Sequence, residues 1–329
     1  MDRSRVRREV APMSQNPFDP QLFRREAIPT EVRAYNEAFL KRMAELPAPT
    51  IRNRDASSPS PFPAIPKSPR ARVRKLPAAE GRKVEVRIVP PASGSPRGAY
   101  LHLHGGGLVF GSADQDDTLL ERIANATGLA TVSVEYRLAP QHPYPAAWDD
   151  CETAAVWLAK NVAAEFGGTA LAIGGESAGA TLAVPVLVRM RDKHGFTGFR
   201  AANLSYGNYD SSMTPSQIWV GANRYVIGTE DIRQCSNAYA PDVAQRRNPD
   251  MSALYAQLVH LPPALFSVGT LDPFLDDSLF LYARWIAAGN EAELAVYPGA
   301  PHGFNIIGHP HASGANARID TFLRARTQT

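Results

Sequence analysis

Cysteine is scarce in this sequence. The 329 residues hold two, Cys151 and Cys235, far apart along the chain. Two cysteines cannot build the dense disulfide framework that stabilises small secreted domains. A single bridge between them stays open, but two unpaired thiols are expected.

Long apolar runs are also lacking, so no membrane-spanning helix is expected. The first twelve residues, MDRSRVRREVAP, are charged and contain no apolar core of a signal peptide. These two absences predict a cytoplasmic protein that does not enter a membrane.

A strong net charge is absent as well. Lys and Arg total 35 and Asp and Glu total 32, which gives a formal charge of +3. So slight an excess does not indicate nucleic-acid binding, and the basic cluster at 67–75 is interpreted as a solvated face. Apolar residues, in contrast, make up 44% of the chain, enough for a large core.

Strand-like and helix-like segments alternate along most of the chain. Two strands are predicted around the turn AAEG at 78–81. Six apolar runs are predicted to be further strands: GAYLHLH (98–104), LATVSVEY (129–136), TALAIGG (169–175), RAANLSY (200–206), PALFSVG (263–269) and AELAVYP (292–298). Helical patterns lie between most of them. This alternation indicates a mostly parallel sheet with helices on both faces.

Two segments interrupt the alternation. Residues 30–46 show an amphipathic helical pattern that Thr30 is expected to cap, and a Ser- and Pro-rich stretch follows at 55–69. More than fifty residues separate the runs at 200–206 and 263–269, too many for a plain loop. We therefore divide the chain into an N-terminal cap segment with the start of a linker (1–55), a first part of the core (56–207), a cap insertion (208–250) and a second part of the core (251–329).

The segment GGESAG, residues 174–179, carries the strongest chemical signal. It places the pattern G-x-S-x-G between a strand-like run and a helix-like run, which is the setting of a nucleophile elbow. At such a turn Ser177 adopts a strained conformation that exposes its Oγ, and the flanking glycines avoid clashes. The pattern predicts a serine nucleophile; the alternative is a Gly/Ser turn that merely connects two elements.

A serine hydroxyl is a weak nucleophile, so it needs a base and a group that orients the base. In chains with this elbow the order is serine, acid, histidine. His302 is the candidate base because it lies in a loop just after the last predicted strand. The other histidines after the serine end a helix, precede two prolines or form a loop pair without further metal ligands, so no metal site is predicted: they are His194, His260, His309 and His311.

Three aspartates compete for the role of the acid. Asp272 follows a predicted strand directly, at the sheet edge where Ser177 emerges. Asp276 and Asp277 are expected to begin the next helix, where carboxylates complement the helix dipole. Asp272 is therefore the candidate acid.

The glycine-rich stretch HGGG, residues 104–107, follows the strand-like run at 98–104. It does not fit a dinucleotide-binding loop, because Phe110 stands where that pattern needs a sixth-place Gly or Ala, and the chain has no P-loop pattern. Upstream of a serine elbow it instead indicates an oxyanion-hole loop. The expected donors are the amides of Gly106, Gly107 and Ala178, and His104 and Gly105 are expected to support the loop.

At these motifs the sequence resembles the bacterial hormone-sensitive-lipase-like esterases of the α/β-hydrolase fold. The matching segments occur in family order: HGGGLVFGS, VEYRLAPQHPYPAAWDD, GGESAGATLA, LPPALFSVGTLDPFLDDS and PHGF. The resemblance implies an eight-stranded sheet and a helical cap, and hydrolysis of short-to-medium acyl esters without a cofactor. It matches Ser177, Asp272 and His302 to the family triad. Glu176 departs from the Asp that many members carry at that position.

The sequence thus predicts a serine carboxylesterase that acts on a small ester through an acyl-enzyme intermediate. Five aromatic residues, each by type more often a core residue, are candidates for the substrate pocket: Phe110, Tyr206, Trp219, Phe274 and Phe304. Two alternatives stay open: an amidase or other acyl hydrolase with the same triad, and a binding protein without turnover. The presence of all three triad residues counts against the second. Exposed edge strands could also support a homodimer.

Overall fold

A computed structural model describes residues 18–45, 66–220 and 225–328. One sheet runs through it in the order β1-β2-β4-β3-β5-β6-β7-β8. The strands are β1 (Arg72–Pro77), β2 (Lys83–Val89), β3 (Gly98–Leu103), β4 (Ala130–Glu135), β5 (Ala170–Glu176), β6 (Ala201–Ser205), β7 (Ala264–Gly269) and β8 (Ala292–Tyr297). β2 pairs antiparallel with β1 and β4, and every later pair is parallel. The predicted mostly parallel, eight-stranded sheet is confirmed.

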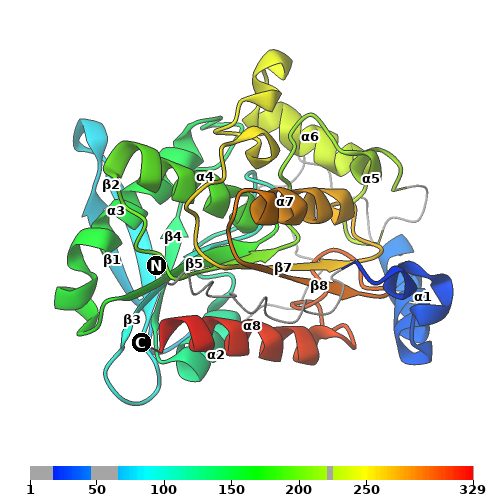
Figure 1. The fold of residues 1–329 in the computed structure, drawn as a ribbon, viewed down its shortest axis with the longest axis horizontal. Coiled ribbons are helices and arrows are strands. Elements are labelled where there is room, and N and C mark those ends of the chain that lie inside the picture. Colours follow the sequence, from blue (N-terminus) through cyan, green and yellow to red (C-terminus); the bar gives the residue numbers. More distant parts are fainter. Residues whose placement is uncertain (1–17, 46–65, 221–224, 329) are drawn as a thin grey trace, which may run out of the picture.

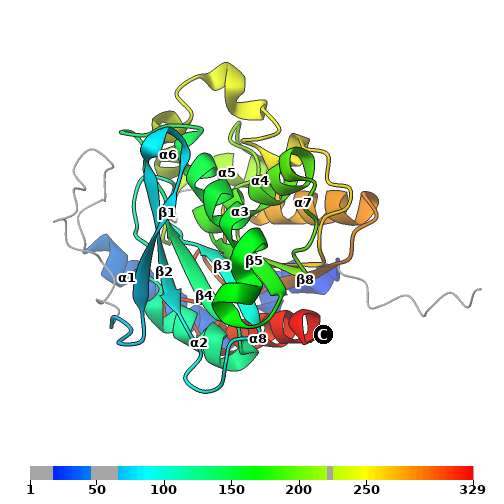
Figure 2. The same cartoon turned by 90° about the vertical axis from the view of Figure 1, so that its left-hand side faces the viewer.

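The helices form two layers, one on each face of the sheet (Figures 1 and 2). They are α1 (Thr30–Ala44), α2 (Asp117–Thr127), α3 (Ala146–Phe166), α4 (Ala178–His194), α5 (Pro215–Ile218), α6 (Thr229–Tyr239), α7 (Leu275–Ala287) and α8 (Ala312–Thr327), with short 3₁₀ turns at Pro20–Phe23, Arg25–Ala27, Ala79–Gly81, Val243–Arg247 and Ala253–Tyr255. Helices α3, α4 and α7 pack on one face and α2 and α8 on the other. α5 and α6 lie on the side of α7, farther from the sheet (Figure 1).

The central strands are buried on both faces, which explains why they read as nearly continuous apolar runs. All residues of β3, β5, β6 and β7 are buried. Between the sheet and α3, α4 and α7, the largest buried side chains include Trp148, Phe266 and Trp285. On the other face, Ile123 and Phe322 fill a smaller core. Each such side chain contributes about 1.5–3 kcal/mol when it is removed from water.

Each of the six predicted runs coincides with a strand to within one residue at either end, and the predicted pair around 78–81 is β1 and β2. The expected cap of the first helix is wrong. Pro29 occupies the N-cap position of α1, and no side chain caps the helix there. Thr30 is already the first helical residue, so its hydroxyl lies one position too late to accept a bond from the free amides of the first turn.

Helix α1 packs against the loop that follows β8. The side-chain amide of Asn36 donates to the carbonyl of Gly299 at 2.8 Å, and the Tyr35 hydroxyl donates to the carbonyl of Ile307 at 2.8 Å. The remainder of the predicted N-terminal cap segment, at 1–17 and 46–55, lies outside the described residues, as does most of the Ser- and Pro-rich stretch. The division of the chain into four parts stays a prediction.

Both cysteines are unpaired, as expected: Cys151 is buried in α3, and Cys235 lies on α6. Among the residues that the structure describes, no helix combines the length and the apolar character needed to cross a bilayer.

Candidate active site

Three side chains from distant parts of the sequence meet at one edge of the sheet. Ser177 follows β5, Asp272 lies three residues after β7, and His302 lies in the loop after β8. Because these strands are parallel, their carboxyl ends share one edge. The Ser177 hydroxyl lies 2.8 Å from Nε2 of His302, and Nδ1 of His302 lies 3.0 Å and 3.1 Å from the two carboxylate oxygens of Asp272.

The turn that carries Ser177 is strained and tightly packed. Ser177 has φ 56° and ψ −118°, a backbone conformation that residues with a side chain rarely adopt. A Cβ on Gly175 or Gly179 would lie 2.0 Å or 1.7 Å from the carbonyl oxygen of Leu103 on β3. Glycine at both positions therefore lets the turn approach the neighbouring strand, and the serine hydroxyl is presented at the sheet edge.

The carboxylate of Asp272 fixes the orientation of the imidazole. Asp272 is buried, and its Oδ1 also accepts the amide N–H of Phe274 at 2.9 Å. Because a carboxylate only accepts hydrogen bonds, Nδ1 of His302 carries a proton and Nε2 is left as the acceptor for the serine O–H. This tautomer is the one that is able to accept a proton from a serine hydroxyl.

Aromatic rings hold the imidazole of His302 from two sides. The ring of Tyr206 meets it edge-on at 4.9 Å between centroids, and the ring of Phe274 does so at 5.2 Å. Phe304 in turn packs edge-on against Tyr206 at 5.9 Å. All three are buried. The two rings that contact the imidazole therefore limit the space in which it can rotate.

The other two aromatic candidates are less buried than these three. Phe110 is partly buried and packs against the large core. Trp219 is 77% exposed, because it follows the last residue of α5 at the surface. The pocket that sequence analysis assigned to all five aromatics stays a prediction.

The glycine loop after β3 has the conformation of a tight turn. Gly106 has φ 122° and Gly107 has φ 63°, and a Cβ on Gly106 would lie 2.2 Å from the carbonyl oxygen of Phe110. The carbonyl of Gly106 accepts the amides of Val109 and Phe110, while no hydrogen bond in the described part of the chain uses the N–H of Gly106 or Gly107. Ala178 begins α4, so its N–H has no carbonyl four residues earlier within the helix.

His104 lies beneath this loop and not in the reacting group. Its ring stacks on Tyr136 with centroids 4.0 Å apart, and its Nδ1 lies 2.8 Å from the carbonyl of Gly105. Since a carbonyl only accepts, Nδ1–H donates to Gly105 and fixes the backbone at the start of the loop. Burial lowers the pKa of His104 to about 3, so the ring is neutral at physiological pH.

The loop histidines that sequence analysis set aside have structural contacts. Nδ1 of His309 accepts the amide N–H of His311, and the ring of His309 packs edge-on against Tyr35 and Phe304. Within the described ranges, no group of three or more His, Cys, Asp or Glu is arranged to hold a metal ion.

Sequence reasoning missed two neighbours of this site. Cys235 on α6 lies against Gly107, and no local pattern in the sequence indicates that contact. His102 on β3 lies 3.0 Å from the carboxylate of Glu176, the residue before Ser177. The sequence does place both residues near the ends of buried strands. Only the register between these adjacent strands, however, shows that the two side chains can meet.

Comparison with known proteins identifies the family of this chain. The alpha/beta hydrolase fold family matches residues 100–306. An ethyl acetate hydrolase from Pseudomonas putida is 31% identical over 239 residues, which are 71% of this chain and 75% of that protein. The carboxylic ester hydrolase LipN of Mycobacterium tuberculosis is 31% identical over 253 residues, 74% of this chain and 67% of that protein.

Solved structures give the same result over nearly the whole chain. An esterase from the bacterial hormone-sensitive lipase family superposes with a TM-score of 0.77 at 28% identity, covering 91% of this chain and 99% of that one. The esterase of the archaeon Pyrobaculum calidifontis superposes with a TM-score of 0.73 at 25% identity, covering 96% and 94%. This chain therefore belongs to the α/β-hydrolase-fold family, and within it to the hormone-sensitive-lipase-like esterases.

Proposed function

We propose that this protein is a serine carboxylesterase in which Ser177 is the nucleophile, His302 the general base and Asp272 the group that orients the base. The observation that carries the proposal is the continuous line of contacts from hydroxyl to imidazole to carboxylate, at 2.8 Å and 3.0 Å. A line of this kind at a strained strand-to-helix turn activates a hydroxyl for acyl transfer.

The reaction takes two steps. In the first, Ser177 attacks the ester carbonyl while Nε2 of His302 removes the hydroxyl proton and then returns it to the departing alcohol. In the second, His302 removes a proton from water, which attacks the carbonyl carbon of the acyl-enzyme. The bond between that carbon and Oγ of Ser177 then breaks, His302 returns the proton to Oγ, and the acid is released. Asp272 stabilises the imidazolium that forms in each step. The serine, the histidine, the aspartate and one water molecule supply every group that the two steps use.

The amides of Gly106, Gly107 and Ala178 are the proposed donors to the oxyanion of each tetrahedral intermediate. Two features support this role: the glycine loop has N–H groups without a partner in the described chain, and Ala178 begins a helix. Loss of one such donor typically costs about 2.7–4 kcal/mol of transition-state stabilisation. His104 and Gly105 support the loop from below.

Hydrolysis of p-nitrophenyl butyrate tests the proposal. The wild-type protein is expected to release p-nitrophenol and to react covalently with a fluorophosphonate at Ser177, while Ser177→Ala does neither. Turnover by Ser177→Ala at the wild-type rate would disprove the assignment. Labelling without turnover would favour a binding protein, and faster cleavage of a matched anilide than of the ester would favour an amidase.

The substrate class we propose is esters with short-to-medium acyl chains. One of the relatives is an ethyl acetate hydrolase, and the buried rings of Tyr206, Phe274 and Phe304 fill the space beside His302. Rates on acetate, butyrate and palmitate esters of p-nitrophenol are expected to fall sharply at palmitate. Equal rates on butyrate and palmitate would contradict this limit.

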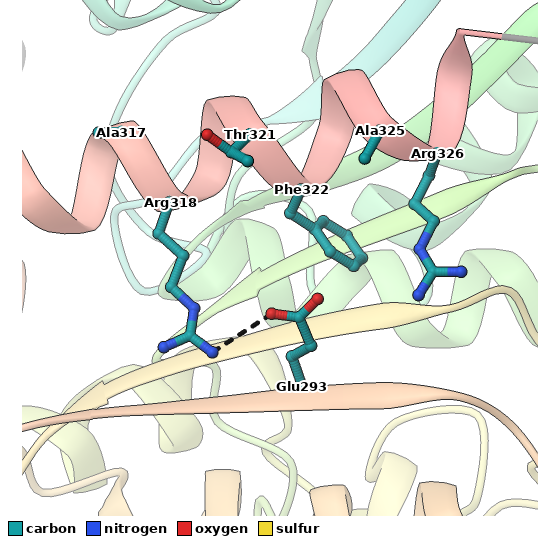
Figure 3. Close-up of a pocket in the computed structure, with 7 residues that line it drawn as sticks. All are labelled: Glu293, Ala317, Arg318, Thr321, Phe322, Ala325 and Arg326. Carbon is teal, nitrogen blue, oxygen red and sulfur yellow. Dashed lines mark hydrogen bonds and ion pairs between the residues drawn. The ribbon is translucent and has the colours of Figure 1, made fainter. Parts of the chain in front are cut away.

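A homodimer through the edge strand β8 is the assembly we propose. Within the described sheet β8 pairs with β7 alone, so its other edge has backbone groups available for a second chain. A hollow lies beside this edge between β8 and α8, lined by Glu293, Arg318 and Phe322 among others (Figure 3). Analytical ultracentrifugation should find twice the chain mass of 35.7 kDa; a single-chain mass at all concentrations would rule the dimer out.

We also propose a cytoplasmic location without nucleic-acid partners. The unpaired Cys151 and Cys235 suit a reducing compartment, and the charge of +3 is too small for a polyanion-binding surface. Fractionation of cells and a DNA-binding assay at low salt test these two points; export of the protein or salt-sensitive retention on DNA would contradict them.

A further inference from the structure

A second histidine lies in the sheet beneath the nucleophile. His102, near the end of β3, is completely buried. Its Nε2 lies 3.0 Å from a carboxylate oxygen of Glu176 on β5, and its Nδ1 lies 3.1 Å from the hydroxyl of Ser133 on β4. The imidazole thus joins three adjacent strands by side-chain contacts, in addition to the hydrogen bonds of the sheet.

A glycine lies opposite His102 in the strand register. In the register of β3 and β5, His102 pairs with Gly174, and Glu176 is the next residue of β5 on the same face. A Cβ on Gly174 would lie 2.2 Å from the carbonyl oxygen of Asn203 and 2.7 Å from the hydroxyl of Tyr100, so no larger residue fits there.

The contact lies near the carboxyl ends of the two strands. After β3 the chain continues into the glycine loop, and after β5 it continues directly into Ser177. The two paths remain close, since a Cβ on Gly105 would lie 3.1 Å from the carbonyl oxygen of Glu176. Any change in the spacing between β3 and β5 at this point moves the oxyanion loop relative to the serine.

The charges around His102 favour its protonated form. Burial lowers its pKa, but the hydrogen bond to Glu176 and the negative charges of Glu176 and Asp116 raise it more, and the net direction is upward. The charge of His102 in turn contributes to the lowered pKa of the neighbouring His104. A protonated ring donates from both nitrogens, to Ser133 and to Glu176, and a bond between charged groups is stronger than one between neutral groups.

Glu176 depends on this bond. Its Oε1 is buried and has no hydrogen-bond partner among the described residues, so His102 holds the carboxylate through Oε2. Departure of the imidazole would leave an unpaired buried carboxylate next to the nucleophile, which is costly. The two side chains therefore hold one another in place.

We propose that His102 and Glu176 are a pair of positioning residues that fix the distance between the oxyanion loop and Ser177. This inference rests on the proposed esterase function. Neither side chain touches the triad directly, so neither is a catalytic residue. The pair acts on the geometry of the tetrahedral intermediate, in which the serine and the loop must both reach the same carbonyl group.

The experiment replaces the pair in two ways. The double variant H102L/E176L removes the bridge without leaving a buried charge, and H102Q/E176Q keeps a bridging hydrogen bond between two neutral amides. With p-nitrophenyl butyrate as substrate, kcat of the Leu pair is expected to fall about 10- to 100-fold, since a small misplacement of reacting groups costs this much. KM is expected to keep its wild-type value, and the Gln pair is expected to recover most of kcat.

Labelling of Ser177 by a fluorophosphonate should slow in parallel with kcat, because the phosphonyl oxygen occupies the same proposed oxyanion hole as the ester oxygen. E176D, which keeps the charge but shortens the side chain, is the second variant if the Leu pair does not fold, and its kcat is expected to fall at constant KM. The proposal is overturned if H102L/E176L or E176D keeps the wild-type kcat. It is also overturned if H102Q/E176Q is as slow as H102L/E176L. Absence of hydrolysis by the wild-type protein would instead refute the proposed function.

Discussion

The sulfur of Cys235 lies 2.7 Å from the point that a Cβ on Gly107 would occupy. Helix α6 therefore places a side chain directly against the glycine loop, although 128 positions separate the two residues in the sequence. This contact ties the segment between β6 and β7 to the chemistry at the edge of the sheet.

Gly107→Ala is expected to lower kcat for p-nitrophenyl butyrate. The new methyl group collides with Cys235, and φ of +63° is unfavourable for alanine by about 1–2 kcal/mol. Adding Cys235→Ala to Gly107→Ala removes the collision but not the backbone strain, so the double variant should recover part of the rate. A double variant no faster than Gly107→Ala would show that the sulfur is not the obstacle.

Asp272→Asn is expected to reduce kcat by about 10⁴-fold with the fold retained, because an amide can stabilise the wrong tautomer of the imidazole. Asp276→Asn is the matched control. Asp276 accepts the amide of Ser216 and has no hydrogen bond to His302, so its replacement should leave most of kcat intact. Steady-state rates and circular dichroism of both variants check this, and an equal loss in the two would contradict the assignment of the acid.

Gly179→Ala is expected to destabilise the protein by about 1–3 kcal/mol or more, because the new methyl group would overlap a backbone oxygen of β3 that cannot move aside. Gly314→Ala is the control on α8, where nothing lies within 4 Å of the added Cβ, and alanine should stabilise that helix by about 0.5–1 kcal/mol. Urea unfolding of the two variants measures the difference. Equal midpoints would contradict the tight approach of the elbow to β3.

The unfolding free energy is expected to fall on acidification because of His309. Burial, with a smaller contribution from His311, lowers the pKa of His309 to about 4 in the folded protein from an ordinary 6.5. Between these values the unfolded chain binds a proton that the folded chain does not, so stability present above about pH 6.5 is lost as the pH falls toward 4.

His309→Asn isolates this effect. An asparagine oxygen can accept the amide of His311 as the imidazole does, and it does not titrate. Urea unfolding at about pH 7.5 and about pH 4.5 should therefore show a larger acid loss for the wild type than for the variant. Burial raises the pKa values of Asp116 and Asp277 to about 6 and about 7, so these two groups change the unfolding free energy with pH in the opposite direction. Their contributions cancel when the acid loss of the variant is subtracted from that of the wild type. An identical loss in both proteins would contradict the prediction.

The sequence was sufficient to predict the strands and the candidate triad, because local patterns of residues determine both. Buried parallel strands must be apolar throughout, so the six runs could be located to within one residue. The turn around Ser177 needs glycines at fixed offsets, and the order serine, acid, histidine then left few candidates. For that reason Asp272 and His302 could be selected before any distance was known.

Contacts that depend on register or on the path of long connections could not be predicted. The pairing of His102 with Glu176 requires knowing that Gly174 lies opposite the imidazole. The contact of Cys235 with Gly107 requires the path of the segment between β6 and β7. Trp219 shows the limit of residue type as a guide, since a large aromatic side chain in this segment is mostly exposed.

The order of the candidate triad along the chain has a consequence for the nascent protein. The proposed base, His302, lies 125 positions after the proposed nucleophile, Ser177. A ribosome that has completed the glycine loop and the serine turn has therefore not yet made the imidazole that is proposed to deprotonate the serine. On this proposal, the growing chain is not expected to acylate itself on cellular esters before residue 302 has been made.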